Sequence, residues 1–319
     1  MTEPEARRWP ALHLAGLEVF PGRRRDAALP VARLPSQGWL ELPVALLHGA
    51  RPGPRVWVSA AVHGDELNGV EVVRQLLSRL DPGQMAGTLI AVPVVNVFGL
   101  YGKTRYTPDR RDLNRMFPGS EQGSIASRLA SMFMREVVAG SDLGVDLHTG
   151  SDHRTNVPQL RYDFRDERLA APADAFGAEL TIHKVAKRGT LRGAAAELGV
   201  PVLLWEAGEP QRYESAAIEA GVLGLRRLLA HLGMVEVEDP PGPSTIRLKS
   251  THWVRAPRGG LFRAEVEPGQ RVQRGAILGR IGNPLEEPQV VRASRDAYVI
   301  GLALGPVLFQ GDLVAHLAW

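Results

Sequence analysis

The chain has 319 residues, of which 44% are hydrophobic and 23% are charged, and its formal net charge is +3. This composition is ordinary for a globular protein, and the length suffices for one large domain and a smaller one. The chain has no cysteine, which excludes disulfides, thiolate metal ligands and cysteine nucleophiles.

Prolines interrupt residues 1–35, which we expect to be irregular. Apolar runs then alternate with segments of helical period, which predicts an α/β domain with a mixed, mostly parallel sheet flanked by helices. The expected strands are residues 38–48, 56–62, 88–97, 143–148, 158–164, 180–185 and 201–205. The expected helices are residues 67–80, 124–138, 166–177, 191–198 and 215–232. Pro43 cannot donate a ladder hydrogen bond, so the first strand is expected at a sheet edge.

Two further segments differ from this pattern. Residues 98–119 have little periodicity, and a loop of that length in a compact domain is usually functional. The proline-rich residues 239–245 read as a linker between a catalytic domain, 1–238, and a second domain, 246–319. In the second domain the helical period vanishes and similar segments recur 35 to 37 residues apart, which predicts a small all-β barrel or sandwich.

Polar residues follow several of the expected strands, where open α/β sheets place their sites. His63 and Glu66 lie three residues apart at a strand-to-helix junction, so their side chains can face one point. His148 ends another expected strand and is the natural third ligand, and Asp146, on the same side, is a candidate to orient its imidazole. Three such protein ligands suit a catalytic zinc ion, which keeps a position for water.

Zinc chemistry of this kind needs a further carboxylate. Bound zinc lowers the pKa of its water toward ~7, and a nearby carboxylate then accepts the proton and returns it to a leaving amine. Glu206, at the end of an expected strand, suits that role, and Glu209 is its rival. The alternative for Glu206 is a structural ion pair with Arg192 or a neighbouring base.

Taken in chain order, these motifs resemble the succinylglutamate desuccinylase/aspartoacylase family, which belongs with the zinc carboxypeptidases. The motifs are His63 with Glu66, the stretch Asp-Leu-Asn-Arg-Met-Phe-Pro-Gly at 112–119, the stretch Asp-Leu-His-Thr-Gly at 146–150, and Glu206. The resemblance covers roughly residues 40–235. It implies that His63, Glu66 and His148 bind one zinc ion per chain and that Glu206 is the general base and acid.

The resemblance also implies roles for several polar residues. Asn114 and Arg115 would hold a substrate carboxylate, although they could instead cap a turn and pair with Asp112. Arg105 resembles the arginine that polarises the scissile carbonyl, and Arg192 a further carboxylate-binding arginine. The alternatives to Arg105 are Arg110 and Arg111. Residues 246–319 resemble a biotinyl/lipoyl-like barrel without the carrier lysine, so we expect a lid or scaffold.

The expected function is therefore removal of an acyl group from a small N-acyl amino acid by a zinc-dependent hydrolase. The alternative is a zinc carboxypeptidase that trims a C-terminal residue from a peptide or protein tail; an open cleft would favour it, whereas a cavity capped by residues 246–319 would favour the small amide. No apolar run approaches the ~20 residues that span a bilayer, and no signal segment or long basic run is present. We expect a cytoplasmic protein that binds neither membranes nor nucleic acid, with homo-oligomerisation left open.

Overall fold

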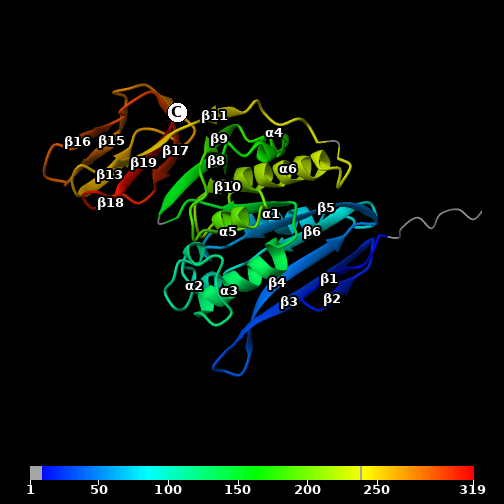
Figure 1. Cartoon of the computed structure of the whole chain (residues 1–319). Coiled ribbons are helices and arrows are strands. Elements are labelled where there is room, and N and C mark those ends of the chain that lie inside the picture. Colours follow the sequence, from blue (N-terminus) through cyan, green and yellow to red (C-terminus); the bar gives the residue numbers. More distant parts are fainter. Residues whose placement is uncertain (1–8, 152, 238) are drawn as a thin grey trace, which may run out of the picture.

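The computed structural model describes residues 9–319 except residues 152 and 238 (Figure 1). Its strands are β1 (Leu12–Leu14), β2 (Leu17–Val19), β3 (Arg23–Arg33), β4 (Trp39–His48), β5 (Arg51–Ala60), β6 (Ala86–Val92), β7 (Leu143–His148), β8 (Arg154–Tyr162), β9 (Leu180–His183), β10 (Val202–Gly208), β11 (Ile246–Leu248), β12 (Thr251–Arg255), β13 (Gly260–Ala264), β14 (Arg271–Val272), β15 (Ile277–Gly282), β16 (Gln289–Arg292), β17 (Ala297–Ala303), β18 (Val307–Leu308) and β19 (Leu313–Ala318). Its α-helices are α1 (Asn68–Leu77), α2 (Val97–Gly102), α3 (Ile125–Phe133), α4 (Ala170–Phe176), α5 (Leu191–Glu197) and α6 (Ser215–His231).

Within the described residues, thirteen strands form one mixed sheet with the order β12-β19-β17-β8-β10-β7-β5-β6-β4-β3, and β9, β11 and β14 pair beside this path. The centre is parallel, because β10, β7, β5 and β6 all run in the same direction. β6 and β7 are buried along their whole length, as expected for strands covered on both faces. The carboxyl ends of the parallel strands therefore meet at one edge of the sheet.

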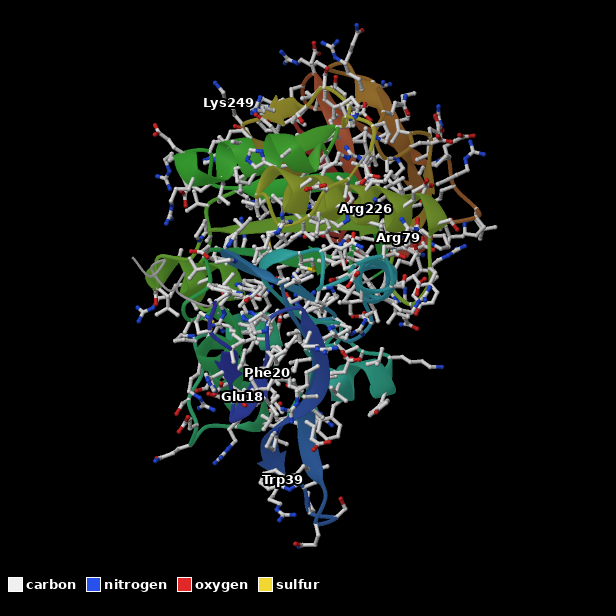
Figure 2. The ribbon with its side chains drawn as sticks, turned by 90° about the vertical axis from the view of Figure 1, so that its right-hand side faces the viewer. Glu18, Phe20, Trp39, Arg79, Arg226 and Lys249 are labelled. Carbon is white, nitrogen blue, oxygen red and sulfur yellow. The ribbon has the colours of Figure 1, made fainter. Side chains whose placement is uncertain are left out.

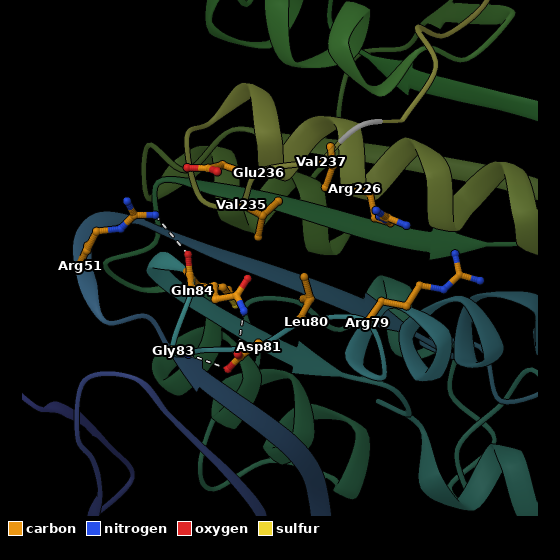
Figure 3. Close-up of a pocket in the computed structure, with 11 residues that line it drawn as sticks. Arg51, Arg79, Leu80, Asp81, Gly83, Gln84, Arg226, Val235, Glu236 and Val237 are labelled. Atoms are coloured by element: carbon orange, nitrogen blue, oxygen red, sulfur yellow. Dashed lines mark hydrogen bonds between the residues drawn. The ribbon is translucent and has the colours of Figure 1, made fainter.

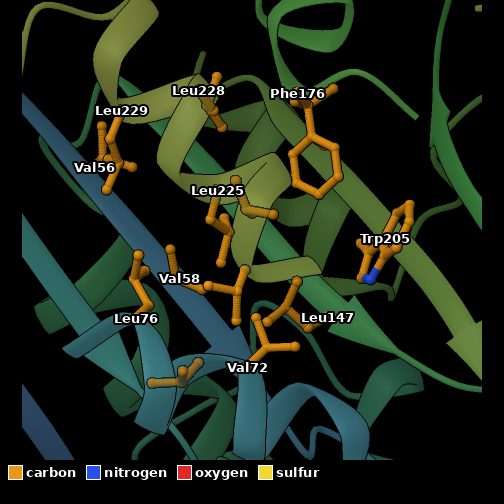
Figure 4. Close-up of a cluster of buried hydrophobic side chains, with 14 of the residues drawn as sticks. Val56, Val58, Val72, Leu76, Leu147, Phe176, Trp205, Leu225, Leu228 and Leu229 are labelled. Atoms are coloured by element: carbon orange, nitrogen blue, oxygen red, sulfur yellow. The ribbon is translucent and has the colours of Figure 1, made fainter. Parts of the chain in front are cut away.

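Helices cover both faces of this centre. Alternate residues of β5 point to opposite sides, so Val56 and Val58 enter one apolar core and Trp57 enters the other. The first core is completed by α1, α4 and α6 (Figure 4). The second is completed by α3, the π-helical turn Met134–Val138 that continues it, and α5. Side-chain caps mark two of these helix starts: Ser124 accepts from the backbone N–H of Ser127, and Thr190 opens α5 in the same way.

Residues 246–319 are all-β and extend the central sheet. β17 pairs antiparallel with β8, β19 and β12 follow it, and β11 pairs parallel with β9. A separate four-stranded sheet, β16-β15-β13-β18, packs with these strands around its own apolar core. The sheet thus crosses the predicted boundary at residues 239–245, and the division into two domains stays a prediction.

The predicted fold class, a mixed α/β sheet with helices on its faces plus a smaller all-β part, is confirmed. Several local predictions were wrong, and residues 97–102, for example, form helix α2 at the start of the predicted loop. Residues 23–33 form β3 and pair with β4, so the N-terminal segment is not irregular throughout. β4 is not an edge strand, but β6 pairs only with its residues 45–48, so Pro43 has a single neighbouring strand, β3. None of the helices in the described part of the chain is both long and apolar enough to cross a membrane.

Candidate active site

Three predicted ligands meet at the carboxyl edge of the parallel strands. His63 and Glu66 lie between β5 and α1, and His148 ends β7, which is the parallel neighbour of β5. Nδ1 of His63 lies 2.7 Å from Oε1 of Glu66, and Nδ1 of His148 lies 2.7 Å from Oε2 of the same carboxylate. All three side chains are buried, and their ligand atoms lie within 4.8 Å of one another.

The outer nitrogen of each imidazole faces a second carboxylate. Nε2 of His148 lies 2.8 Å from Oδ2 of Asp146, whose other oxygen accepts a 2.7 Å hydrogen bond from the Ser59 hydroxyl. Nε2 of His63 lies 3.3 Å from Oδ1 of Asp112. These contacts fix both rings with Nδ1 turned toward Glu66, which is the way carboxylates orient metal-binding histidines.

The charges of this cluster depend on one another. Burial alone would lower the pKa of His148, but Asp146 and Glu66 outweigh it and raise that pKa well above its usual value. Burial likewise would lower the pKa of His63, but Glu66 and Asp112 outweigh burial and raise that pKa. The two imidazoles in turn lower the pKa of Glu66 despite its burial. A buried carboxylate between two imidazoles is stabilised by nearby positive charge. Two nitrogen donors and one oxygen donor are ligands that fit zinc.

A cavity of about 450 Å³ opens beside this cluster. Of the predicted site residues, the structure brings seven to its wall: His63, Glu66, Arg105, Asn114, Arg115, His148 and Glu206. Arg192 is not on that wall. It lines an adjoining cavity of about 170 Å³ that shares Asn114, Arg115, Arg161 and Leu204 with the first.

Glu206 lies directly beside the cluster, because β10 pairs with β7 in a register that sets Glu206 opposite His148. Its Oε1 accepts a 3.0 Å hydrogen bond from Nη1 of Arg161, and its Oε2 accepts a 2.7 Å bond from Nδ2 of Asn156. The ion-pair partner of Glu206 is therefore Arg161 and not Arg192. The rival Glu209 pairs instead with Arg212, outside the residues that line the cavity.

Arg105 lies at the mouth of the metal cluster. Its Nη1 donates to the Ser151 hydroxyl at 2.7 Å and lies 3.7 Å from Oε1 of Glu66. Its Nη2 donates to Oδ2 of Asp112 at 2.8 Å, so one carboxylate bridges Arg105 and His63. Burial alone would raise the pKa of the Asp112 carboxyl, but His63 and Arg105 outweigh burial and hold that pKa well below its usual range. The alternatives Arg110 and Arg111 do not line the cavity.

Asn114 and Arg115 both hold the local chain and face the cavity. They lie in the 3₁₀ turn Leu113–Arg115, and the Asp112 side chain caps that turn by accepting from the Asn114 N–H at 2.9 Å. Oδ1 of Asn114 accepts a 2.9 Å bond from the N–H of Leu191, the first residue of α5. Arg115 remains exposed on the cavity wall. Capping and substrate binding are therefore compatible at this turn.

Sequence reasoning missed several residues of the site. Asn156 and Arg161 hold Glu206, Ser151 donates to Glu66, and Trp253 of β12 reaches the cavity wall from the C-terminal part. No spacing signal marks Asn156 or Arg161, because each looks like an ordinary polar residue of a half-exposed strand. Ser151 alone could have been found, since it directly follows the stretch 146–150.

A further cavity of about 490 Å³ lies at the opposite end of the parallel strands (Figure 3). Its wall includes Arg51 at the start of β5 and Arg226 of α6. Among the described residues, it shares no lining residue with the cavity at Glu206. Open α/β sheets bind ligands at the carboxyl ends of their strands, so the smaller cavity is the candidate active site.

Comparison with known proteins gives independent evidence on the family of the chain. Residues 52–232, more than half of the chain, match the Succinylglutamate desuccinylase/Aspartoacylase catalytic domain. The N-alpha-acetyl-L-2,4-diaminobutyric acid deacetylase of Halomonas elongata is 27% identical to this chain over 296 residues, covering 88% of this chain and 86% of that protein.

Solved structures match over nearly the whole chain. The product-bound ectoine utilization protein EutE (DoeB) from Ruegeria pomeroyi has a TM-score of 0.84 at 26% identity, covering 92% of this chain and 95% of that one. The succinylglutamatedesuccinylase/aspartoacylase from Rhodobacter sphaeroides has a TM-score of 0.83 at 26% identity, with coverage of 92% and 95%. From the match to its catalytic domain and these likenesses, the chain belongs to the succinylglutamate desuccinylase/aspartoacylase family.

Proposed function

We propose that this chain is a zinc-dependent deacylase that hydrolyses a small N-acyl amino acid to a carboxylic acid and a free amino acid. Like its family, it is a hydrolase of amide bonds. One observation carries the proposal: the carboxylate of Glu206 is held by Arg161 and Asn156 beside the buried cluster of His63, Glu66 and His148.

Each part of the site then has a task. Zinc held by His63, Glu66 and His148 would supply a bound water with a pKa near ~7 and a Lewis acid for the carbonyl. Glu206 accepts a proton at its carboxylate when water attacks and delivers it to the leaving amine. Arg105 donates to the carbonyl oxygen as negative charge develops there.

The adjoining cavity favours an anionic substrate. Its wall carries Arg115, Arg161, Lys184, Lys187 and Arg192, whereas Asp146 is the one acidic residue among the described residues that line it and is already bound to His148. Burial, and then the charge of Arg161, lower the pKa of Arg192 to about 10. The pKa of Lys184 falls for similar reasons. A bound carboxylate would relieve this repulsion, so we propose that the substrate carries carboxylate groups on this side.

The carboxypeptidase alternative is less favoured. Trp253, from the C-terminal strands, forms part of the cavity wall, so residues 246–319 cap the site on one side. A cavity of about 450 Å³ suits a small amide better than a protein tail.

A substrate panel tests the proposal. Zinc-loaded protein would be assayed with N-acetyl, N-formyl and N-succinyl derivatives of aspartate, glutamate and 2,4-diaminobutyrate, beside short peptides. We expect hydrolysis of an acidic N-acyl amino acid, abolished by a chelator and restored by zinc. Release of C-terminal residues from peptides, without hydrolysis of any N-acyl amino acid, would contradict the deacylase and support the carboxypeptidase.

Replacing Arg192 by methionine should weaken binding of substrates that carry two carboxylates. Because a hydrogen bond to a charged group contributes about 1.5–3 kcal/mol, KM for a doubly anionic substrate should rise about tenfold or more. KM for a singly anionic substrate should change little. Arg188, exposed in the preceding loop, provides the matched Arg188→Met control. Equal effects on both substrates would contradict a role for Arg192 in binding a second carboxylate.

Replacing Gly301 by alanine should lower kcat by about tenfold, because displacing a catalytic group by ~1 Å is costly. A Cβ at Gly301 would lie 2.6 Å from Oδ1 of Asn156, so the amide that holds Glu206 must move. Zinc content should not change. A Cβ at Gly305 would meet no atom of the described residues within 4 Å, so Gly305→Ala is the control. Unchanged kcat in the Gly301 variant would argue against positioning of Glu206 by Asn156.

A further inference from the structure

One row of residues connects the C-terminal strands to Glu206. Trp253 of β12 lies opposite His316 of β19, His316 lies opposite Gly301 of β17, and Gly301 lies opposite Asn156 of β8. Residues directly opposite in antiparallel strands point to the same face of the sheet. Trp253 and His316 therefore lie on the face where Asn156 binds Glu206, and the Asn156 side chain lies over Gly301, where a Cβ would come within 2.6 Å of its Oδ1.

The Trp253 ring rests on His316. The two ring centroids are 3.7 Å apart and the planes differ by 9°, which is a close parallel stack. His316 is 2% exposed, and neither of its ring nitrogens has a hydrogen-bond partner among the described residues. A buried imidazole without such partners is costly, whereas its flat ring gives the indole a stacking surface. Burial, and then the charges of Arg161, Lys184 and Arg154, lower the pKa of His316 to about 2, so the stack is neutral at physiological pH.

Trp253 lines the cavity at Glu206 but does not line the adjoining cavity that carries Lys184, Lys187 and Arg192. Arg161 lines both the cavity at Glu206 and the adjoining basic cavity. Arg154 lies close to Trp253, with its guanidinium carbon 5.5 Å from the centre of the Trp253 ring. A substrate whose carboxylate is held in the adjoining basic cavity therefore extends its other end into the cavity that Trp253 lines.

We propose that Trp253 is a specificity-determining residue that limits the length of the acyl group, and that His316 is the residue that positions it. The inference rests on the proposed deacylase function, in which the carboxylates belong to the amino acid and the acyl group is the opposite end. Of the described residues in 246–319, Trp253 is the one that lines the cavity. A short acyl group packs against the indole, and a longer one collides with it.

The test compares acyl chains of different length on one amino acid. The amino acid is the preferred one from the substrate panel, and its N-acetyl, N-butanoyl and N-hexanoyl derivatives keep the charge constant. For the zinc-loaded full chain we expect kcat/KM to fall at least tenfold from acetyl to hexanoyl. In Trp253→Ala the hexanoyl-to-acetyl ratio should rise at least tenfold, and in Trp253→Phe it should rise less.

The His316 variants separate positioning from mere packing. His316→Phe keeps a flat ring under the indole and should retain the wild-type ratio, whereas His316→Ala should raise it in the same direction as Trp253→Ala. The control is Trp39→Ala, because Trp39 lies at the tip of the β3–β4 hairpin, away from the site (Figure 2).

Each outcome decides the proposal. An unchanged ratio in Trp253→Ala, with zinc bound, would overturn the role of Trp253 and leave the deacylase function standing. If the wild-type chain hydrolyses none of the N-acyl amino acids, the function fails and this inference fails with it. If Trp253→Ala does not fold, unchanged ratios in both Trp253→Phe and His316→Ala would overturn the proposal.

Discussion

Replacing Glu206 by glutamine should abolish most of the turnover while leaving zinc bound. Glutamine keeps the size of the side chain and can still contact Asn156, but it cannot accept a proton from water. General acid–base catalysis contributes about 10²–10⁴-fold, so kcat should fall by that factor, with a smaller change in KM. The measurement is steady-state kinetics together with zinc content per chain.

The matched control for Glu206 is Glu209→Gln. Glu209 is three residues away, pairs with Arg212 and does not line the cavity, so its loss should change kcat less than threefold. If the two variants exchanged their effects, the proton-transfer role would belong to Glu209. Retained activity in Glu206→Gln would refute the role of Glu206 as general base.

Replacing His148 by alanine should remove the metal and, with it, detectable hydrolysis. Even the loss of a residue that merely orients a metal-bound histidine costs about 10–100-fold in metal affinity or activity, so the loss of a ligand should cost more. The change also leaves the buried Asp146 without its imidazole partner, so the melting temperature should fall. Zinc analysis after dialysis and thermal unfolding measure the two effects.

An exposed histidine controls for this experiment. His252 lies at the surface of β12, and His252→Ala should keep about one zinc per chain, full activity and the wild-type melting temperature. His63→Ala should behave like His148→Ala, because both imidazoles face the same Glu66 carboxylate. A wild-type chain that hydrolyses amides after complete removal of metal would refute the zinc assignment.

Much of the fold could be predicted because its signals are local. β7 begins and ends at the predicted residues, since a short run of buried apolar residues between a polar turn and a polar motif has clear limits. The grouping of His63, Glu66 and His148 was equally predictable, because parallel strands must bring their carboxyl ends to one edge. The roles of these residues stay predictions until metal binding is measured.

The parts of the fold and of the site that could not be predicted depend on which strands become neighbours in the sheet. β3 is largely exposed and carries charges and a proline, so its sequence resembles a loop. Asn156 and Arg161 reach Glu206 because β8 inserts antiparallel beside β10, and Trp253 reaches the cavity because β17 pairs with β8. Strand order and register of this kind have no signal in the spacing of residues along one chain.

The pairing of β17 with β8 makes the arrangement of the active site depend on the C-terminal strands. The strand that carries Asn156 has β10 on one side and β17 on the other, so removal of residues 246–319 would leave a bare backbone edge next to the residue that holds Glu206. A recombinant that exchanges these residues with a relative would keep full activity only if the partner of Asn156 stayed a glycine. The substrate range of such an enzyme would therefore change by substitution at positions such as 253 more readily than by exchange of the whole segment.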